Sequence, residues 1–306
     1  MELVRQALAK ISVESIRKHV EVLEGVRHPV AAPAALEQAR VYVSDVLKTL
    51  GYSIEEHPFL DNGSEFSNVI ATRRGRLFPK RRLLVVAHYD TVSNSPGADD
   101  NASGVAVLLE IATVLSTLSM EKTVQFVAVN LEENADEAVS GTGLRGSRAL
   151  AARAKEEGWE IDGVLVLESV AFASETAVQT TPAGLPMEVP SKGNFLAAIG
   201  NESSNGLLQA FSQAVKRHCA ALPVVPLAVP GNGEMLRDTR RSDHAPFWDQ
   251  GFQAVMLTDT TNFRNPHYHE PSDTLDTLNL SFAAEVCRAT AGCLMDLAGG
   301  VEEREA

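Results

Sequence analysis

Cysteine is scarce in this chain of 306 residues, which contains only Cys219, Cys287 and Cys293. Their spacing does not match that of a zinc site built from thiolates, which indicates against a structural metal of that kind. We expect all of them to be buried apolar side chains in a reducing compartment. The sequence therefore predicts a cytoplasmic protein.

Long apolar runs are also missing, since no window approaches the ~18 residues of a membrane span. Residues 1–25 carry charges throughout and lack the apolar core and cleavage site of a signal peptide. We therefore predict no membrane partner and no export. A formal net charge of −13 argues against a nucleic-acid partner, which needs clustered basic side chains. We interpret the one dense basic run, Arg73–Arg82, as a solvated hairpin tip.

Helical and strand patterns alternate along the chain. The predicted helices cover about 13–25, 34–50, 102–118, 143–157, 203–217 and 280–298. Between them lie a hairpin (YSIEEHPFL and EFSNVIATRRG) and the apolar runs RRLLVVAH, VQFVAVNL, DGVLVLES, NFLAAIG, 223–229 and GFQAVMLTD. This alternation predicts the α/β class, with a mostly parallel sheet covered by helices on both faces. No linker is visible, so residues 1–306 are predicted to form a single domain.

Histidines and acids lie at or near the ends of these strands. They are His88, Asp90, Asp99, Asp100, Glu132, Glu133, Glu168 and His269. Imidazole and carboxylate without thiolate suit a catalytic divalent metal. In open α/β sheets ligands bind beyond the carboxyl ends of the strands, so the pattern indicates a zinc hydrolase.

Each fragment also has a simpler interpretation. The side chains of His88 and Asp90 point to the same side of an extended segment. The carboxylate could accept the other ring N–H of a metal-bound imidazole, or the two residues could be a surface pair. Asp99, in the turn PGADDNASG, could bridge two cations or belong to a helix cap.

Glu132 and Glu133 end an apolar strand and would repel one another without a cation or a shared proton, unless they face solvent. Glu168 closes a strand too apolar for an unpaired charge. His269 lies in a loop where His267 competes for the same role, and a loop histidine is often simply exposed.

The ordered series AHYD, GADDNASG, the EE pair, the acid after the next strand, SDHAPFW and HYHEPSDT resembles the peptidase M28 family of di-zinc aminopeptidases. The resemblance covers about residues 66–280 and implies a three-layer α/β/α sandwich with a mixed sheet of about eight strands. It implies two zinc ions per chain, held by His88 and Glu168 on one side, by Glu133 and His269 on the other, and by Asp99 between them.

The resemblance also implies that Glu132 is the general acid/base and that Asp90 orients His88. It implies a cis peptide between Asp99 and Asp100, and a pocket floor shaped by the segment 242–244. The expected activity is that of an exopeptidase, an aminopeptidase that hydrolyses the N-terminal peptide bond through a water between the metals.

The sequence departs from the family at the position of Glu168, where relatives often carry Asp. It also lacks the aromatic hydroxyl that some relatives have just before the S-D-H segment, so no oxyanion donor beyond the metals is named. Arg240 and Arg241 stand there instead and could hold a substrate carboxylate, or could pair with Asp238 and Asp243.

Three alternatives remain at this point. The first is a carboxypeptidase-like or small-amide hydrolase, in which those arginines bind the substrate. The second is a glutaminyl cyclase-like acyltransferase with a single zinc. The third is a binding module without activity, against which the complete set of ligand positions argues. The oligomeric state and the preferred side chain are not predicted.

Overall fold

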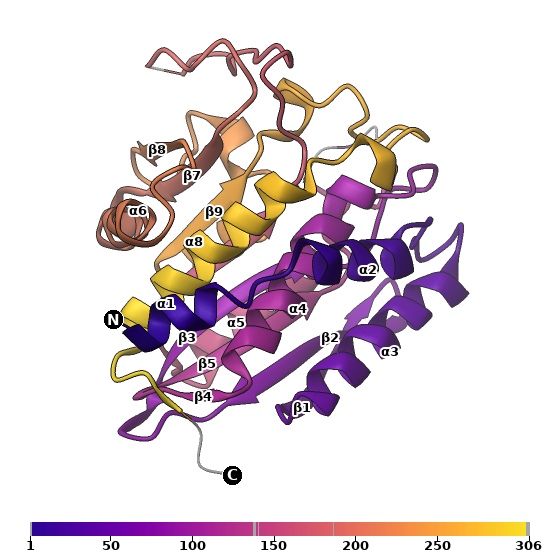
Figure 1. Cartoon of the computed structure of the whole chain (residues 1–306). Coiled ribbons are helices and arrows are strands. Elements are labelled where there is room, and N and C mark those ends of the chain that lie inside the picture. The colour runs from indigo at the N-terminus through magenta and orange to yellow at the C-terminus, as the bar shows by residue number, and fades with distance from the viewer. Residues whose placement is uncertain (1, 137–138, 140, 186, 304–306) are drawn as a thin grey trace.

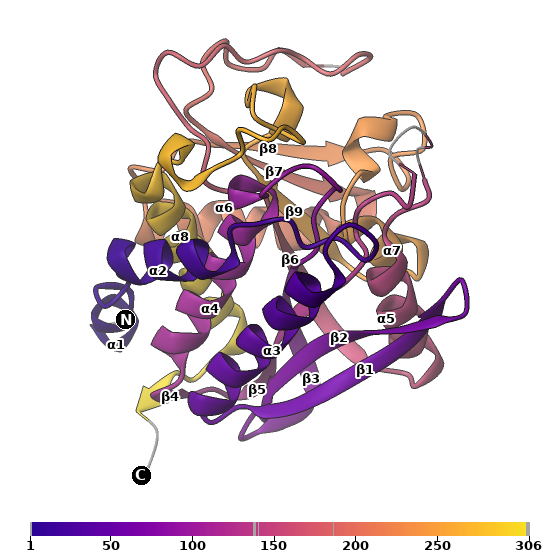
Figure 2. The same ribbon diagram turned by 90° about the vertical axis from the view of Figure 1, so that its right-hand side faces the viewer.

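The computed structural model describes residues 2–136, 139, 141–185 and 187–303. Its centre is an eight-stranded sheet in the order β1-β2-β5-β3-β6-β9-β7-β8 (Figure 1). The strands are β1 (Ser53–Asp61), β2 (Ser64–Arg73), β3 (Phe78–His88), β5 (Lys122–Val129), β6 (Glu160–Glu168), β7 (Leu196–Asn201), β8 (Val224–Val229) and β9 (Ala254–Thr258). A small second sheet pairs β4 (Leu118–Ser119) with the C-terminal strand β10 (Glu302–Glu303) (Figure 2).

The middle of the large sheet is parallel. β5, β3, β6 and β9 run in one direction, while β2 and β7 pair with this group in the antiparallel sense. β1 pairs with β2 as the predicted antiparallel hairpin, and β8 runs parallel to β7. The prediction of a mixed, mostly parallel sheet is confirmed.

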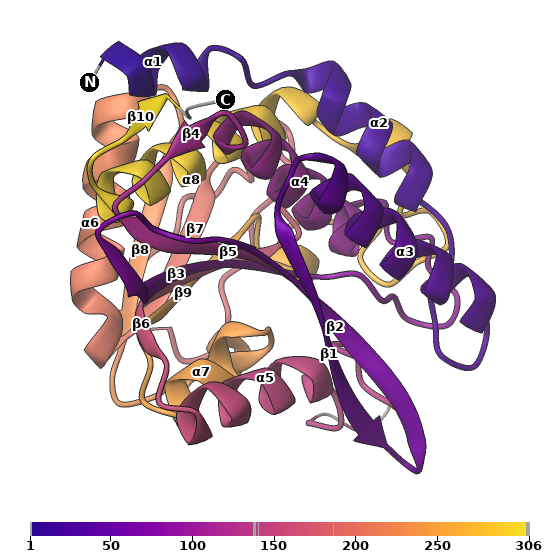
Figure 3. The ribbon, with the colours of Figure 1, turned by 90° about the horizontal axis from the view of Figure 1, so that it is seen from below.

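Helices cover both faces of the sheet, as the view along its layers shows (Figure 3). One face carries α1 (Glu2–Leu8), α2 (Val13–Leu23), α3 (Pro33–Thr49), α4 (Gly104–Leu115), α6 (Asn205–His218) and α8 (Leu280–Ala298). The other carries α5 (Arg145–Glu156) and α7 (His244–Asp249). The predicted three-layer α/β/α arrangement is therefore confirmed, although α1 and α7 had no counterpart among the predicted helices.

Alternation along the buried strands creates two cores. Leu83, Val85 and Ala87 of β3 belong to the cluster under α4 and α8, whereas Leu84 and Val86 belong to the cluster under α5 and α7. Successive side chains of a strand point to opposite faces, so a continuous apolar run fills both layers at once.

Two smaller predictions have different outcomes. The cysteines are free and buried, as expected. The basic run Arg73–Arg82 is not a hairpin tip, because β5 lies between β2 and β3 and those strands do not pair with each other. In the part of the chain that the structure describes, no helix has the length and apolarity needed to cross a membrane.

Phe126 provides a test of the core in the middle of the sheet. Its side chain is fully buried, and its ring meets that of Tyr52 edge to face with centroids 5.4 Å apart. We expect Phe126→Ala to lower the free energy of unfolding by ~3–5 kcal/mol, the usual cost of removing a buried aromatic ring. Denaturant unfolding measures this, with Phe126→Leu as the milder control. A loss no larger than that of the leucine variant would contradict this account of the core.

Candidate metal centre

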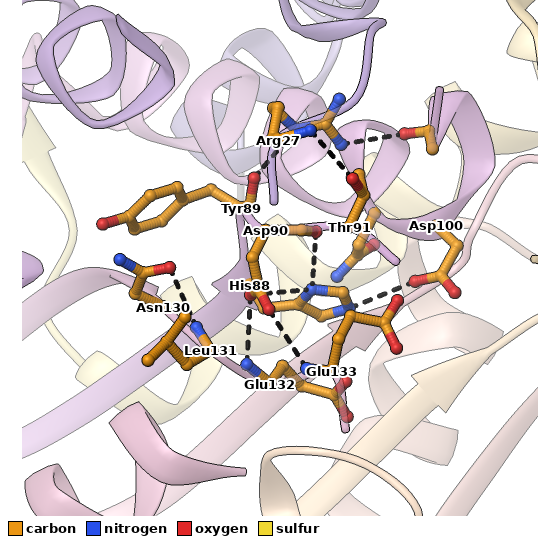
Figure 4. A network of polar contacts seen from close by, with 12 residues as sticks. Arg27, His88, Tyr89, Asp90, Thr91, Asp100, Asn130, Leu131, Glu132 and Glu133 are labelled. Carbon is orange, nitrogen blue, oxygen red and sulfur yellow. Dashed lines mark hydrogen bonds and ion pairs between the residues drawn. The ribbon is translucent and has the colours of Figure 1, made fainter. Parts of the chain in front are cut away.

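The candidate site lies at the carboxyl ends of β3, β5 and β6. His88 is the last residue of β3, and Glu132 and Glu133 follow β5 (Figure 4). Glu168 is the last residue of β6. Because β3 pairs in parallel with both neighbours, these three strand ends reach the same edge of the sheet. The fold therefore brings together side chains that are up to 80 residues apart in the sequence.

Two groups of possible ligands share one carboxylate. The first contains His88, Asp100 and Glu168, and the second contains Asp100, Glu133 and His269. The Nε2 atom of His88 lies 3.2 Å from Oδ1 of Asp100 and 3.4 Å from Oε2 of Glu168. The Nε2 atom of His269 lies 3.2 Å from Oδ2 of Asp100 and 3.3 Å from Oε2 of Glu133. Each oxygen of Asp100 thus faces a different group.

The donor atoms of these groups are poorly satisfied by the protein itself. Among the described residues, Nε2 of His88, Nε2 of His269, Oδ1 of Asp100 and Oε1 of Glu133 are buried without a hydrogen-bond partner. Buried polar atoms are normally paired, so unpaired atoms that converge call for an explanation such as an ion. Imidazole nitrogens and carboxylate oxygens are ligands that zinc accepts. The residues therefore fit a divalent cation.

Protonation of these groups depends on their mutual charges. Burial opposes charge on His269, but its contacts with Asp100 and Glu133 outweigh burial and raise its pKa to about 10. Burial also raises the pKa of Glu133, to about 7, with the charge of Asp100 acting in the same direction. Without metal the histidine holds a proton that a cation must displace, so zinc affinity is expected to fall as the pH is lowered.

The prediction for the bridging residue is wrong by one position, because Asp100 and not Asp99 lies between the histidines. The Asp99 carboxylate is turned away and accepts hydrogen bonds from the backbone N–H of Ala171 at 3.0 Å and from Nδ2 of Asn265 at 2.8 Å. The cis peptide also lies one residue later than predicted, between Asp100 and Asn101. Adjacent acids in one turn cannot be distinguished by residue type.

Asp90 has more contacts than predicted (Figure 4). Nδ1 of His88 lies 3.2 Å from the backbone oxygen of Asp90 and 3.4 Å from its carboxylate. The two carboxylate oxygens also accept the backbone N–H groups of Glu132 and Glu133, each at 3.1 Å. Asp90 therefore orients the His88 ring and holds the turn that contains Glu132 and Glu133.

Asp273 holds the Asp100 turn in the same way, and the sequence analysis did not single it out. It is fully buried, and its two oxygens accept the backbone N–H groups of Asp99 at 2.9 Å and of Asp100 at 3.1 Å. Its position in the HYHEPSDT segment, four residues after His269, was the only sequence signal for it.

An apolar pocket opens beside Glu168. Its floor is a face of the sheet, formed by alternate residues of three strands: Ala197 and Ile199 of β7, Val225 and Leu227 of β8, and Met256 and Thr258 of β9. The irregular segment 174–192 contributes Leu185 and Met187 to the wall. The described helices α5 and α7 pack over the strands nearer the middle of the sheet, which leaves this end for the pocket.

Tyr268 is a residue that the sequence analysis missed. It lines the same pocket, and its ring stacks on that of His269 with centroids 3.9 Å apart. Its hydroxyl oxygen accepts a hydrogen bond from Nη2 of Arg241 at 3.1 Å. Burial raises the pKa of Tyr268 well above its ordinary value, so the phenol keeps its proton. Its place just before a candidate ligand was the available signal.

The arginines pair only partly as the sequence suggested, because Arg241 forms an ion pair with Asp238 whereas Arg240 pairs elsewhere. Arg240 makes its ion pair with Asp249 at 2.8 Å. Arg241 donates to Oδ1 of Asn262 at 2.8 Å, and its guanidinium is 3.9 Å from the carboxylate of Asp238. Arg241 therefore borders the pocket with mainly neutral partners.

The S-D-H segment, residues 242–244, contacts the candidate site through Ser242. The hydroxyl of Ser242 lines the pocket and donates to Oε2 of Glu168 at 2.7 Å. Asp243 is fully buried nearby, and Nε2 of His244 lies 2.7 Å from the backbone oxygen of Thr239. None of the three belongs to a ligand group found among the described residues. His267, the predicted competitor of His269, contacts Ser272 instead.

An α/β sheet with paired histidine and carboxylate ligands at the carboxyl ends of its strands defines a metal-dependent hydrolase. The family model of peptidase family M28 matches residues 68–293, and the chain belongs to that family. It is a metallopeptidase, and zinc is named for two of the proteins that it resembles, a probable zinc metalloprotease and a zinc aminopeptidase from Bacillus subtilis.

Relatives of known sequence agree with this assignment. The uncharacterized protein YfbL of Escherichia coli is 30% identical over 90% of this chain and 85% of its own length. A probable zinc metalloprotease of Leptosphaeria maculans is 29% identical over 66% of this chain and 48% of its own length, so the chain spans about half of that protein. A probable leucine aminopeptidase of Trichophyton verrucosum is 23% identical over 96% of the chain and 76% of its own length.

Solved structures share the fold. An aminopeptidase from Aneurinibacillus superimposes with a TM-score of 0.72 at 17% identity, covering 97% of this chain and 96% of its own. A glutaminyl cyclase from Porphyromonas gingivalis does so with a TM-score of 0.71 at 19% identity, covering 94% and 99%. At these identities the likeness concerns the fold alone.

Amide variants of Asp99 and Asp100 test which of the two carboxylates bridges the ligand groups. We expect Asp100→Asn to weaken zinc binding by more than the ~10–100-fold loss typical of residues that only support a ligand. Asp99→Asn should keep the zinc content of the unaltered protein, because its side chain faces Ala171 and Asn265. Metal analysis after dialysis distinguishes the two. Loss of zinc from the Asp99 variant alone would restore the original assignment.

Proposed function

We propose that this protein is an aminopeptidase with two zinc ions per chain, and that residues 1–306 act as one catalytic domain. The observation that carries the proposal is the Asp100 carboxylate shared by two ligand groups. The named leucine aminopeptidase relative supports the type of peptidase. His88 and Glu168 would hold one ion, Glu133 and His269 the other, and Asp100 both.

The bound ions would polarise the scissile carbonyl and lower the pKa of a water toward ~7. Glu132 belongs to neither ligand group and is 8% exposed at the site. Burial, reinforced by Glu168 and Glu133, raises its pKa well above the ordinary value, although His88 acts against this shift. A carboxyl with a raised pKa can take a proton from water and pass it to the departing amine.

Tyr268 supplies the oxyanion donor that the sequence analysis did not find. Its oxygen accepts from the cationic Arg241, which leaves the phenol proton to donate to the developing oxyanion. A donor polarised by a charged neighbour forms a stronger hydrogen bond. Preorganised donors of this kind stabilise the transition state more than the ground state.

The substrate's amino terminus would lie among the acids. Glu168 lines the apolar pocket and Glu132 lies close enough to interact with its charge, and this pair of carboxylates favours an ammonium group over a carboxylate. The pocket itself would take the side chain of the first residue. Its floor of aliphatic side chains favours an apolar residue over a polar one.

One observation favours a second candidate. The guanidinium of Arg241 borders the pocket without a carboxylate at hydrogen-bonding distance among the described residues, so it could bind a substrate carboxylate. A carboxypeptidase-like or small-amide hydrolase would use it in this way. The glutaminyl cyclase alternative is compatible with the fold, but a single-zinc site would leave one complete ligand group without a use.

The role of Glu132 can be separated from that of Glu133. We expect Glu132→Gln to lower kcat by ~10²–10⁴, the usual contribution of general acid/base catalysis, with zinc content unchanged. Glu133→Gln should lose metal, because its carboxylate faces His269. Turnover and metal analysis on both variants form the matched pair. Exchanged phenotypes would reverse the two assignments.

A substrate panel tests the aminopeptidase itself, with and without added zinc. We expect leucyl anilide to exceed asparaginyl anilide in kcat/KM by ~10–100-fold, since burying an aliphatic side chain is worth ~1.5–3 kcal/mol. The residues are similar in size, so polarity is the variable. N-acetylation of the leucyl substrate should abolish turnover. Faster hydrolysis of the acetylated or a carboxylate-bearing amide would favour the second candidate.

A further inference from the structure

Arg27 lies in the segment between α2 and α3, ahead of the region that the family model matches, and it is 2% exposed. Its guanidinium donates to backbone carbonyl oxygens of separate segments. The acceptors are Tyr89 at 2.8 Å, Gly25 at 2.8 Å, Pro96 at 2.9 Å, Gly97 at 3.0 Å, and Leu23. A buried cation thus joins the end of α2 to both ends of the single connection, residues 89–97, that follows β3.

A candidate metal ligand lies next to each end of this connection. Tyr89 stands between His88 and Asp90, and Gly97 comes three residues before Asp100. Gly97 has a φ of +60°, and a Cβ there would meet the backbone oxygen of Asp100 at 2.3 Å and Nη2 of Arg27 at 3.0 Å. The turn and the guanidinium therefore pack too closely for any larger residue.

The backbone of Arg27 adds a second link to the same region. The N–H of Arg27 donates to Oγ1 of Thr91 at 2.8 Å, and the N–H of Thr91 donates to the carbonyl oxygen of Arg27 at 3.0 Å. Thr91 follows directly after Asp90, and Figure 4 shows Arg27 above these residues. The segment that contains Arg27 is thus attached to the His88–Asp90 strand end through both side chain and backbone.

Only an arginine can serve all these acceptors. Its planar guanidinium presents five N–H donors, whereas a lysine presents three from one nitrogen. Every acceptor recorded for the Arg27 side chain among the described residues is a carbonyl oxygen, so the contacts act on the backbone path. Burying such a cation is costly unless its donors are satisfied.

We infer that Arg27 is a positioning residue of the metal centre, which holds the His88 and Asp100 segments at the separation needed to share a cation. The inference rests on the proposed metal site. The charge of Arg27 by itself repels a cation, so its hydrogen bonds and its charge have opposite effects on metal affinity. Loss of the hydrogen bonds should dominate, because they fix two ligand-bearing segments.

Arg27→Lys and Arg27→Met separate these effects, since the lysine keeps the charge and the methionine removes it. We expect both to weaken zinc binding by ~10–100-fold, as for other residues that orient ligands. Competition with a zinc-chelating dye measures affinity, and thermal unfolding of the metal-free protein measures the structural effect. Arg73 is the matched control, because it also donates to carbonyl oxygens, those of Ser116 and Leu50.

Arg73 lies opposite Val124 near the start of β5, at the end of the sheet remote from the site. Arg73→Lys and Arg73→Met should lower the melting temperature without changing zinc affinity. Unchanged affinity in both Arg27 variants, or tighter binding by Arg27→Met, would overturn the inference. If the Arg27 variants do not fold, Thr91→Val takes their place, and the inference then requires that this variant bind zinc more weakly. An unaltered protein that binds no zinc would instead refute the proposed function.

Discussion

The two oxygens of the Asp100 carboxylate face different histidines, each 3.2 Å away from an Nε2 atom. This shared acid ties together the ligand groups that begin at β3 and at the loop before α8. Around it lie Glu133 and Glu168, whose negative charges would repel one another in a buried site without a cation. The geometry of the remaining residues depends on keeping this carboxylate in place.

Backbone anchoring accomplishes this placement. Asp90 accepts the N–H groups of the Glu132–Glu133 turn, and Asp273 accepts those of the turn that contains Asp100. In both cases a buried carboxylate binds two successive amides and leaves the neighbouring side chains directed at the site. Hydrogen bonds of this kind orient the ligands that the two turns carry.

The pocket follows from how the helices are distributed over the sheet. α5 and α7 pack over the strands in its middle, and the face of β7, β8 and β9 towards the other end becomes the pocket floor. Strand alternation supplies the aliphatic side chains, while the strand end at Glu168 supplies the polar edge. The apolar pocket and the candidate metal site are therefore adjacent, because one sheet provides both.

The sequence by itself determined the α/β class, the long helices, and the ligand candidates His88, Glu133, Glu168 and His269, because periodicity and residue type are local properties. It did not determine which of the adjacent acids bridges the two groups, since Asp99 and Asp100 have the same chemistry. Tertiary structure decided this by directing one carboxylate toward the histidines and the other toward Ala171 and Asn265.

The roles of Tyr268, Asp273 and Arg27 were also decided only in three dimensions. Each acts through partners distant in sequence: Arg241 for the tyrosine, the Asp100 turn for the aspartate, and the carbonyls of Tyr89 and Gly97 for the arginine. Hydrogen bonds to backbone atoms leave no signature in residue type, because every residue offers the same carbonyl and all but proline the same N–H. The sequence could therefore indicate the ligands, and only the fold could show what holds them.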